Sequence, residues 1–219
     1  MKKSAILFLT FITFIVIIGG LGCTINYINE KDIIYIDPGH GGFDGGASSN
    51  DKKILEKDLV LNISLKLKYY LEQIGYKVLL TRDRDIALSN TKTKDIHKRV
   101  SLINNSHCLL YISIHANSYP SEKIKGAQTF YNPNNDNNKQ LALSIMEQLH
   151  NIDPYNTRKE KSLKGKYLLD KVEKVGCLIE VGFLTNNQEL NLLTDDIYQE
   201  KLAYSIYLGI INYFNKSGE

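Results

Sequence analysis

The chain has 219 residues, of which 43% are hydrophobic and 23% are charged. That balance is typical of a globular protein and excludes a largely disordered chain. The 27 basic and 24 acidic residues leave a formal net charge of +3 and are spread along the sequence. Because they form no basic patch, no nucleic-acid partner is predicted. The length favours one domain with a short additional segment.

The beginning of the sequence has the layout of an export signal. Two lysine residues precede an apolar run over residues 5–18, and small residues and Cys23 follow. Residues 1–28 are therefore predicted to be a signal peptide or a membrane anchor, and the rest of the chain is expected to be exported. The uncharged stretch continues to Asn29, which is long enough for a membrane-spanning helix of roughly 20 residues. Retention as an anchor and lipid attachment at Cys23 both stay open.

Strands and helices are predicted to alternate after this segment. In chain order, the apolar patterns predict a strand at 33–36, a helix at 55–74, a strand at 76–81, a helix at 94–105, strands at 109–114 and 126–131, a helix at 139–150, a short strand at 167–169, a strand at 177–181 and a helix at 197–214. This alternation predicts a single α/β domain over residues 32–216. We expect a three-layer sandwich, in which a largely parallel twisted sheet has helices on both faces.

Polar residues stand at or near the ends of three predicted strands. His40 follows the first strand in a glycine-rich turn, His115 follows the strand at 109–114, and Glu180 lies within the strand at 177–181. Because the carboxyl ends of parallel strands collect ligands at one edge of a sheet, we expect these side chains to lie close together.

The residue types at this edge are typical of a catalytic zinc site. Such a site uses three nitrogen or oxygen ligands and leaves a fourth position to water. His40, His115 and Glu56, which lies in the first turn of the helix at 55–74, supply that set. The ligand types alone also fit other cell-wall zinc hydrolases, such as endopeptidases and sugar deacetylases.

Glu180 is the least ordinary residue in the chain, because it interrupts an apolar strand. Burying an unpaired carboxylate costs several kcal/mol, so a partner such as a metal-bound water is expected. An ion pair with a lysine or arginine at the edge of the core is the alternative.

Taken together, these motifs resemble the zinc-dependent N-acetylmuramoyl-L-alanine amidases of the third amidase type. The resemblance covers residues 33–214. It implies that His40, Glu56 and His115 bind Zn²⁺ and that Glu180 is the catalytic glutamate in hydrolysis of the amide bond between the lactyl group of N-acetylmuramic acid and L-alanine in peptidoglycan. The motifs that carry it are Asp37-Pro38-Gly39-His40-Gly41-Gly42, Glu56-Lys57-Asp58, Ser113-Ile114-His115-Ala116-Asn117 and Ile179-Glu180-Val181-Gly182-Phe183-Leu184-Thr185-Asn186.

Further residues are candidates for supporting roles. Asn117 is predicted to orient the substrate or a water molecule. Arg99 is predicted either to clamp a stem-peptide carboxylate through its planar guanidinium or to occupy a surface position on its helix. Asp37 is a candidate hydrogen-bond partner of a ligand imidazole. Asn186 is predicted to cap a helix that begins near Gln188.

Within this family the chain most resembles the compact enzymes of the spore cortex, which remove stem peptides as a step toward the muramic δ-lactam required for germination. The predicted partners are the glycan strand and stem peptide of peptidoglycan, together with a regulatory or accessory protein. The alternatives are a vegetative autolysin or cell-separation amidase, another cell-wall zinc hydrolase, and an inactive relative that only binds the wall.

Overall fold

The computed structural model describes residues 32–217. The signal or anchor predicted for residues 1–28, with Cys23, lies outside the described residues. Within residues 32–217, no helix has both the length and the apolar character needed to cross a membrane.

A six-stranded sheet forms the middle layer of the molecule, with the strand order β2-β1-β3-β6-β4-β5. Four neighbouring strands run parallel, whereas β4 pairs antiparallel with β6 and β5 follows the direction of β4. The strands are β1 (Ile33–Pro38), β2 (Lys77–Leu80), β3 (Leu110–Asn117), β4 (Gln128–Tyr131), β5 (Lys161–Ser162) and β6 (Val175–Phe183).

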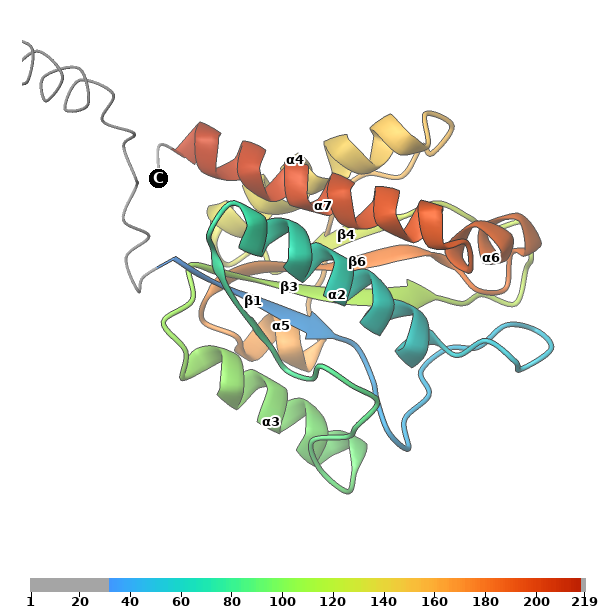
Figure 1. The fold of residues 1–219 in the computed structure, drawn as a ribbon, viewed down its shortest axis with the longest axis horizontal. Coiled ribbons are helices and arrows are strands. Elements are labelled where there is room, and N and C mark those ends of the chain that lie inside the picture. The colour runs from blue at the N-terminus through green and yellow to red at the C-terminus, as the bar shows by residue number, and fades with distance from the viewer. Residues whose placement is uncertain (1–31, 218–219) are drawn as a thin grey trace, which may run out of the picture.

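Helices cover both faces of this sheet (Figure 1). One face carries α2 (Glu56–Gln73), α4 (Asp136–Ile152) and α7 (Asp196–Ser217), and the opposite face carries α3 (Lys92–Asn104) and the short α5 (Tyr167–Lys171). The remaining helix, α6 (Asn187–Leu193), follows β6. The predicted three-layer α/β sandwich with a largely parallel sheet is confirmed.

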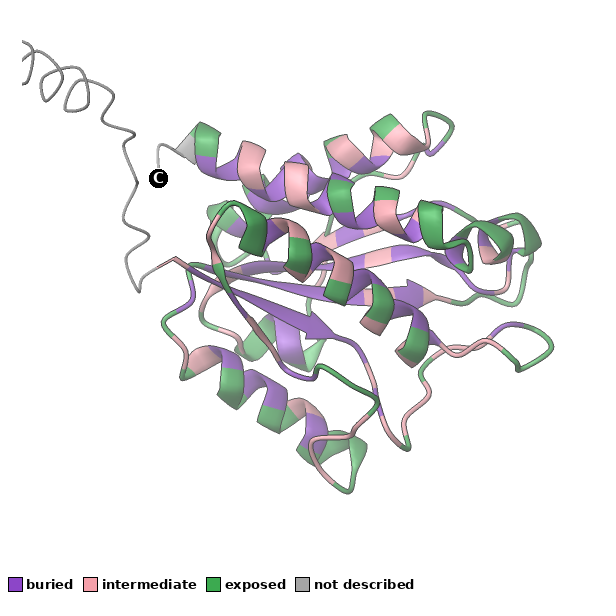
Figure 2. Cartoon of the chain, in the orientation of Figure 1, coloured by how far each residue is buried: buried purple, intermediate pink, exposed green. Residues whose placement is uncertain are grey.

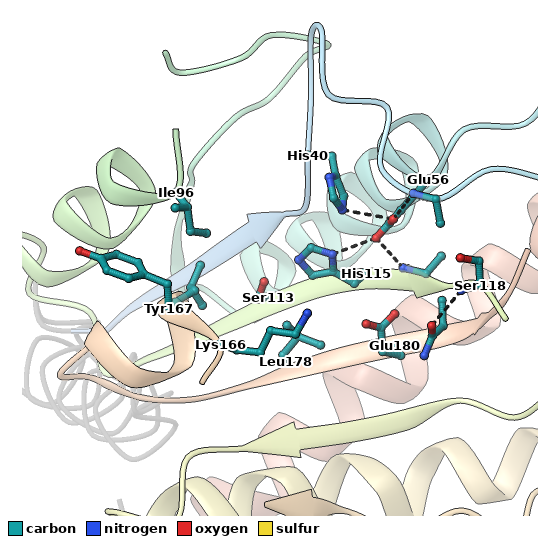
Figure 3. Close-up of a pocket in the computed structure, with 14 residues that line it drawn as sticks. His40, Glu56, Ile96, Ser113, His115, Ser118, Lys166, Tyr167, Leu178 and Glu180 are labelled. Atoms are coloured by element: carbon teal, nitrogen blue, oxygen red, sulfur yellow. Dashed lines mark hydrogen bonds and ion pairs between the residues drawn. The ribbon is translucent and has the colours of Figure 1, made fainter. Parts of the chain in front are cut away.

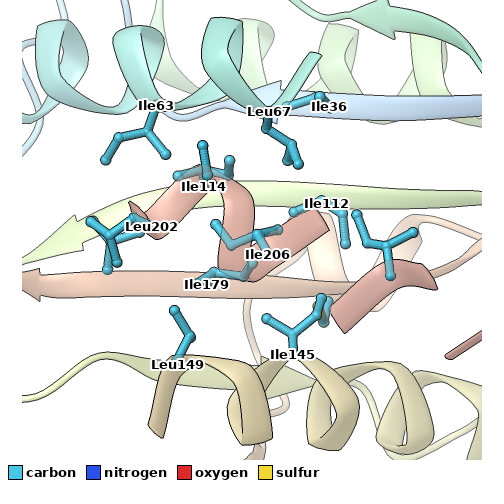
Figure 4. Close-up of a cluster of buried hydrophobic side chains, with 14 of the residues drawn as sticks. Ile36, Ile63, Leu67, Ile112, Ile114, Ile145, Leu149, Ile179, Leu202 and Ile206 are labelled. Atoms are coloured by element: carbon cyan, nitrogen blue, oxygen red, sulfur yellow. The ribbon is translucent and has the colours of Figure 1, made fainter. Parts of the chain in front are cut away.

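The larger apolar core lies between the sheet and α2, α4 and α7. Figure 4 shows how Ile63 and Leu67 of α2 meet Ile114 of β3, while Ile145 of α4 lies toward Ile179 of β6. The helices bury one stripe and expose the opposite one (Figure 2), which is the arrangement expected of amphipathic helices that pack on a sheet.

A smaller core lies on the other face, where Tyr35, Tyr111 and Leu178 of the central strands pack with residues of α3 and α5. Side chains alternate between the faces of a strand. The residues two positions after these three, Asp37, Ser113 and Glu180, therefore lie on the face of the smaller core, near the carboxyl ends of their strands. This alternation places polar groups beside one another at one end of the sheet.

Two local predictions met different outcomes. The strand predicted at 167–169 is wrong, because these residues belong to α5, which buries Leu168 and Leu169 in the smaller core. A run of three residues is too short for periodicity to separate a strand from a turn of helix. The predicted cap of α6 is confirmed, since the Asn186 side chain accepts a hydrogen bond from the Glu189 backbone N–H.

Candidate metal centre

His40 lies in the loop that follows β1, and its backbone is held in an unusual conformation. Its φ angle is 59°, in the left-handed region that residues other than glycine rarely adopt. Buried cations hold the carbonyl groups of this loop, since the Arg82 guanidinium donates to Gly39 O at 2.7 Å and the Arg99 guanidinium donates to His40 O. The fold thus fixes the position of the imidazole through its backbone.

Glu56 links the loops at this end of the sheet. Its carboxylate accepts hydrogen bonds from Ala47 N at 2.6 Å and from Ala116 N at 3.0 Å. Its Oε2 lies 3.2 Å from Nε2 of His40, and its Oε1 lies 2.8 Å from Nδ1 of His115. Two backbone donors and two imidazoles therefore converge on one buried carboxylate (Figure 3).

The three predicted ligands form a preassembled set. One ligand atom from each of His40, Glu56 and His115 lies within 4.8 Å of the others. Burial alone would raise the pKa of Glu56, but hydrogen bonds and charge from His115 and His40 outweigh it and hold that pKa far below its usual range. An ionised carboxylate between two imidazoles is the donor set that zinc prefers, so these residues fit the metal that the sequence predicts.

Asp44 supports the imidazole of His40, with its Oδ2 at 2.8 Å from Nδ1. Asp37 was the candidate for such a contact, and this prediction is wrong. Asp37 instead accepts hydrogen bonds from Thr81 Oγ1 at 2.6 Å, from Ser113 Oγ at 2.8 Å and from the Arg99 guanidinium at 2.8 Å. Asp44 lies four residues after His40, and this spacing in a glycine-rich turn is the signal that identifies it.

Arg99 is not a surface residue, because its side chain is only 3% exposed. Its guanidinium contacts Asp37 at 2.8 Å and Asp95 at 2.6 Å, and it also donates to the carbonyl groups of Pro38 and His40. The predicted surface position is therefore wrong. These contacts engage both ends of the guanidinium inside the protein and tie α3 to the loop that carries His40.

A cavity of about 360 Å³ opens beside the three ligands and is also lined by Glu180 and Asn117. Glu180 pairs with His115 in the register of β6 and β3. Its Oε2 atom is buried and has no hydrogen-bond partner within residues 32–217. Burial raises the pKa of Glu180, an effect that the charge of Glu56 reinforces and that of His115 partly opposes.

Asn117 lies at the end of β3, where its Oδ1 accepts a hydrogen bond from Ser118 N at 2.8 Å. The cavity also contains residues that the sequence analysis did not identify, above all Lys166 and Tyr167. They precede and begin α5, and no local pattern marks them, because their place at the cavity depends on how the loop before α5 packs.

Comparison with known proteins agrees with this site. The family model for N-acetylmuramoyl-L-alanine amidase matches residues 34–212. The germination-specific N-acetylmuramoyl-L-alanine amidase of Bacillus subtilis is 45% identical over 195 residues, which cover 85% of this chain and 81% of that protein. The amidase LytC of the same organism is 30% identical over 186 residues, which cover 84% of this chain but 36% of that protein.

A solved structure is similar over the same region. The CwlD amidase of Clostridioides difficile, determined in complex with the GerS lipoprotein, superimposes with a TM-score of 0.81 at 39% identity, covering 84% of this chain and 99% of that one. These matches confirm the predicted reaction, which is hydrolysis of the peptidoglycan amide bond between N-acetylmuramic acid and L-alanine. The chain belongs to the N-acetylmuramoyl-L-alanine amidase family.

Proposed function

We propose that this amidase depends on zinc and that Glu180 is its general base. His40, Glu56 and His115 would hold the ion, which when bound would polarise the substrate carbonyl and make water a better nucleophile. The observation that carries this proposal is the Oε2 atom of Glu180, which is buried beside the ligand set without any hydrogen-bond partner. A carboxylate oxygen in that position has a natural partner in the attacking water.

Glu180 would transfer one proton twice, first from the attacking water and then to the leaving group. Oε2 of Glu180 accepts the proton of the attacking water, and the same atom returns it to the departing amine of L-alanine. A raised pKa suits both steps, because a group that titrates closer to neutral pH both gains and loses a proton readily. The amide Nδ2 of Asn117, whose Oδ1 is occupied by Ser118 N, would donate a hydrogen bond to the substrate.

The decisive experiment is mass spectrometry of the products released from purified peptidoglycan. Wild-type protein with zinc should release intact stem peptides that begin with L-alanine, and Glu180→Gln should release none while retaining bound zinc. Glu173→Gln, at an exposed position shortly before β6, is the matched control and should behave as wild type. Fragments cut within the peptide, or free acetate, would instead identify a peptidase or a deacetylase.

We further propose that the enzyme acts on spore cortex, where removal of stem peptides precedes formation of muramic δ-lactam. The 45% identity to a germination-specific amidase over 81% of its length supports this role. Deletion of the gene should eliminate δ-lactam from spore muropeptides, and a gene that encodes Glu180→Gln should not restore it. Unaltered δ-lactam together with unseparated vegetative cells would favour the autolysin alternative, for which the similarity to LytC is the supporting observation.

Two further properties belong to this proposal. The protein is expected to be exported and to act at the cell wall, directed by residues 1–28 as a cleaved signal or as an anchor. An accessory protein is expected to control it, a view supported by the solved complex of the similar CwlD amidase with a lipoprotein. The purified chain with zinc is therefore expected to cleave isolated cortex at a reduced rate, and full activity in the absence of any other protein would contradict control by a partner.

A further inference from the structure

One wall of the active-site cavity carries a lysine that no other group neutralises. Lys166 is the only lysine or arginine that lines this cavity among the described residues. It precedes the first turn of α5, and its side chain lies across the cavity from His40 in Figure 3. No described residue forms a hydrogen bond or an ion pair with its ammonium group.

Lys166 is not needed to balance the charges of the catalytic groups. Glu56 already has two imidazoles and two backbone donors. The charge of Lys166 acts on Glu180 across the cavity, but among the described residues no hydrogen bond or ion pair joins this ammonium group to the carboxylate, and Oε2 of Glu180 has no partner there. A cation that faces a cavity without a partner can bind an anionic group that enters from solvent.

The neighbouring residue makes this part of the cavity wall rigid. Tyr167 stacks on His97 of α3 with ring centroids 4.4 Å apart and an interplanar angle of 19°. The Asp170 N–H donates to the carbonyl group of Lys166 at 2.9 Å, which closes the first turn of α5. Lys166 is therefore presented from a fixed backbone, although its own side chain is exposed.

On the opposite side of the metal centre, the surface is mostly polar and uncharged. A second groove of about 380 Å³ shares Ala47 and Ser118 with the catalytic cavity and so continues it. Neutral polar residues and the half-exposed ring of Tyr119 line most of it, and Lys52 is the one charged residue among the described residues that line it. Hydroxyl-rich sugars suit such a surface, because an aromatic ring and neutral hydrogen-bonding groups match the faces and edges of a pyranose.

We propose that Lys166 binds a carboxylate of the stem peptide and thereby sets the direction in which the substrate lies. The peptide would extend from the metal centre toward α5, and the glycan strand would occupy the groove beside Tyr119. The amide bond joins the two parts, so it would lie over His40, Glu56 and His115. This inference rests on the amidase activity and adds a specificity-determining residue to it.

The test uses cortex peptidoglycan in two forms, native and with the stem-peptide carboxylates converted to amides by carbodiimide and ammonium chloride. The variants are Lys166→Ala, Lys166→Arg, Lys52→Ala in the second groove, and Lys164→Ala at an exposed position two residues from Lys166 that does not line the cavity. Released stem peptides are quantified, and kcat and KM are determined for each form. Wild type should prefer the native form by about tenfold in kcat/KM, the order expected of one charge-assisted contact.

Lys166→Ala should reduce this preference to nearly one, through a higher KM for native peptidoglycan, with little change on the amidated form. Lys166→Arg should restore most of the preference, and Lys164→Ala should retain all of it. A full preference in Lys166→Ala would overturn the proposal, as would an equal loss of kcat on both forms, which would mean that Lys166 acts through Glu180. Loss of the preference in Lys52→Ala would reverse the proposed direction of the substrate. If wild-type protein cleaved neither form, the amidase activity itself would fail.

Discussion

Replacement of Arg99 by methionine should destabilise the protein strongly, because Arg99 holds together a buried network. The side chain is 3% exposed and neutralises Asp37, which is 1% exposed. Removing one partner of a buried ion pair typically costs about 3–5 kcal/mol, since the other charge remains in the interior without compensation. For a chain of this size, each kcal/mol lowers the melting temperature by roughly 2–4 °C, so a decrease of roughly 6–20 °C is expected.

Urea denaturation of Arg99→Met and wild type, both free of metal, measures this loss directly. Lys98→Met is the matched control, because Lys98 is exposed on the same helix, and it should change the free energy of unfolding by less than about 0.5 kcal/mol. Arg99→Met should also bind less zinc, since the guanidinium holds the carbonyl group of His40. A variant of normal stability and zinc content whose KM alone increases would refute this reasoning and restore Arg99 as a clamp for the stem peptide.

Three other predictions concern the metal centre and its support. Gly46→Ala should lower zinc content by at least tenfold and also lower the melting temperature, measured by metal analysis and thermal melting. The added Cβ would lie 2.5 Å from Oε2 of Glu56 and 2.6 Å from the His40 ring, at a φ of 72° that an alanine rarely adopts. Burial opposes ionisation of Asp37, but Arg99 and hydroxyl donors outweigh it and hold its pKa below its usual value. The stability that this carboxylate adds is therefore present above about pH 4, and the advantage of wild type over Asp37→Asn in urea should shrink between pH 5 and pH 3. Zinc at 100 times its dissociation constant should stabilise wild type by about 2.7 kcal/mol, and Glu56→Gln should show less than half of this gain at the same concentration.

The sequence predicted the layers of the fold because the relevant signals are local. An uninterrupted apolar run such as Ile33–Ile36 and a helical repeat such as Leu59, Ile63 and Leu67 identify their own elements. The predicted ligands also lie together, because the parallel sheet brings the ends of β1 and β3 to one edge. Their roles in binding zinc remain predictions.

The sequence could not reveal which charges are internal to the protein. Arg99 lies on an amphipathic helix in which the three preceding lysines, Lys92, Lys94 and Lys98, are exposed. Its burial instead depends on Asp37, from a strand 62 positions earlier in the chain. For Lys166 the sequence shows only a lysine in a polar loop, which predicts a solvent-exposed side chain without a role. The packing of that loop places it at the cavity. Both assignments depend on contacts between distant segments, and local patterns do not report such contacts.

The register of the sheet determines where the Glu180 carboxylate lies relative to His115. His115 and Glu180 are register partners on the neighbouring strands β3 and β6, so the spacing of roughly 4.8 Å between strands sets the separation of their backbones. A slip of one residue would turn Glu180 into the larger apolar core, where Ile179 and Val181 now lie. Just beyond this pair the register shifts by one residue, so that Asn117 faces Phe183. A bulge bends its strand and interrupts regular pairing. The shift therefore falls directly after Glu180, whose side chain lines the cavity, although β6 continues to Phe183.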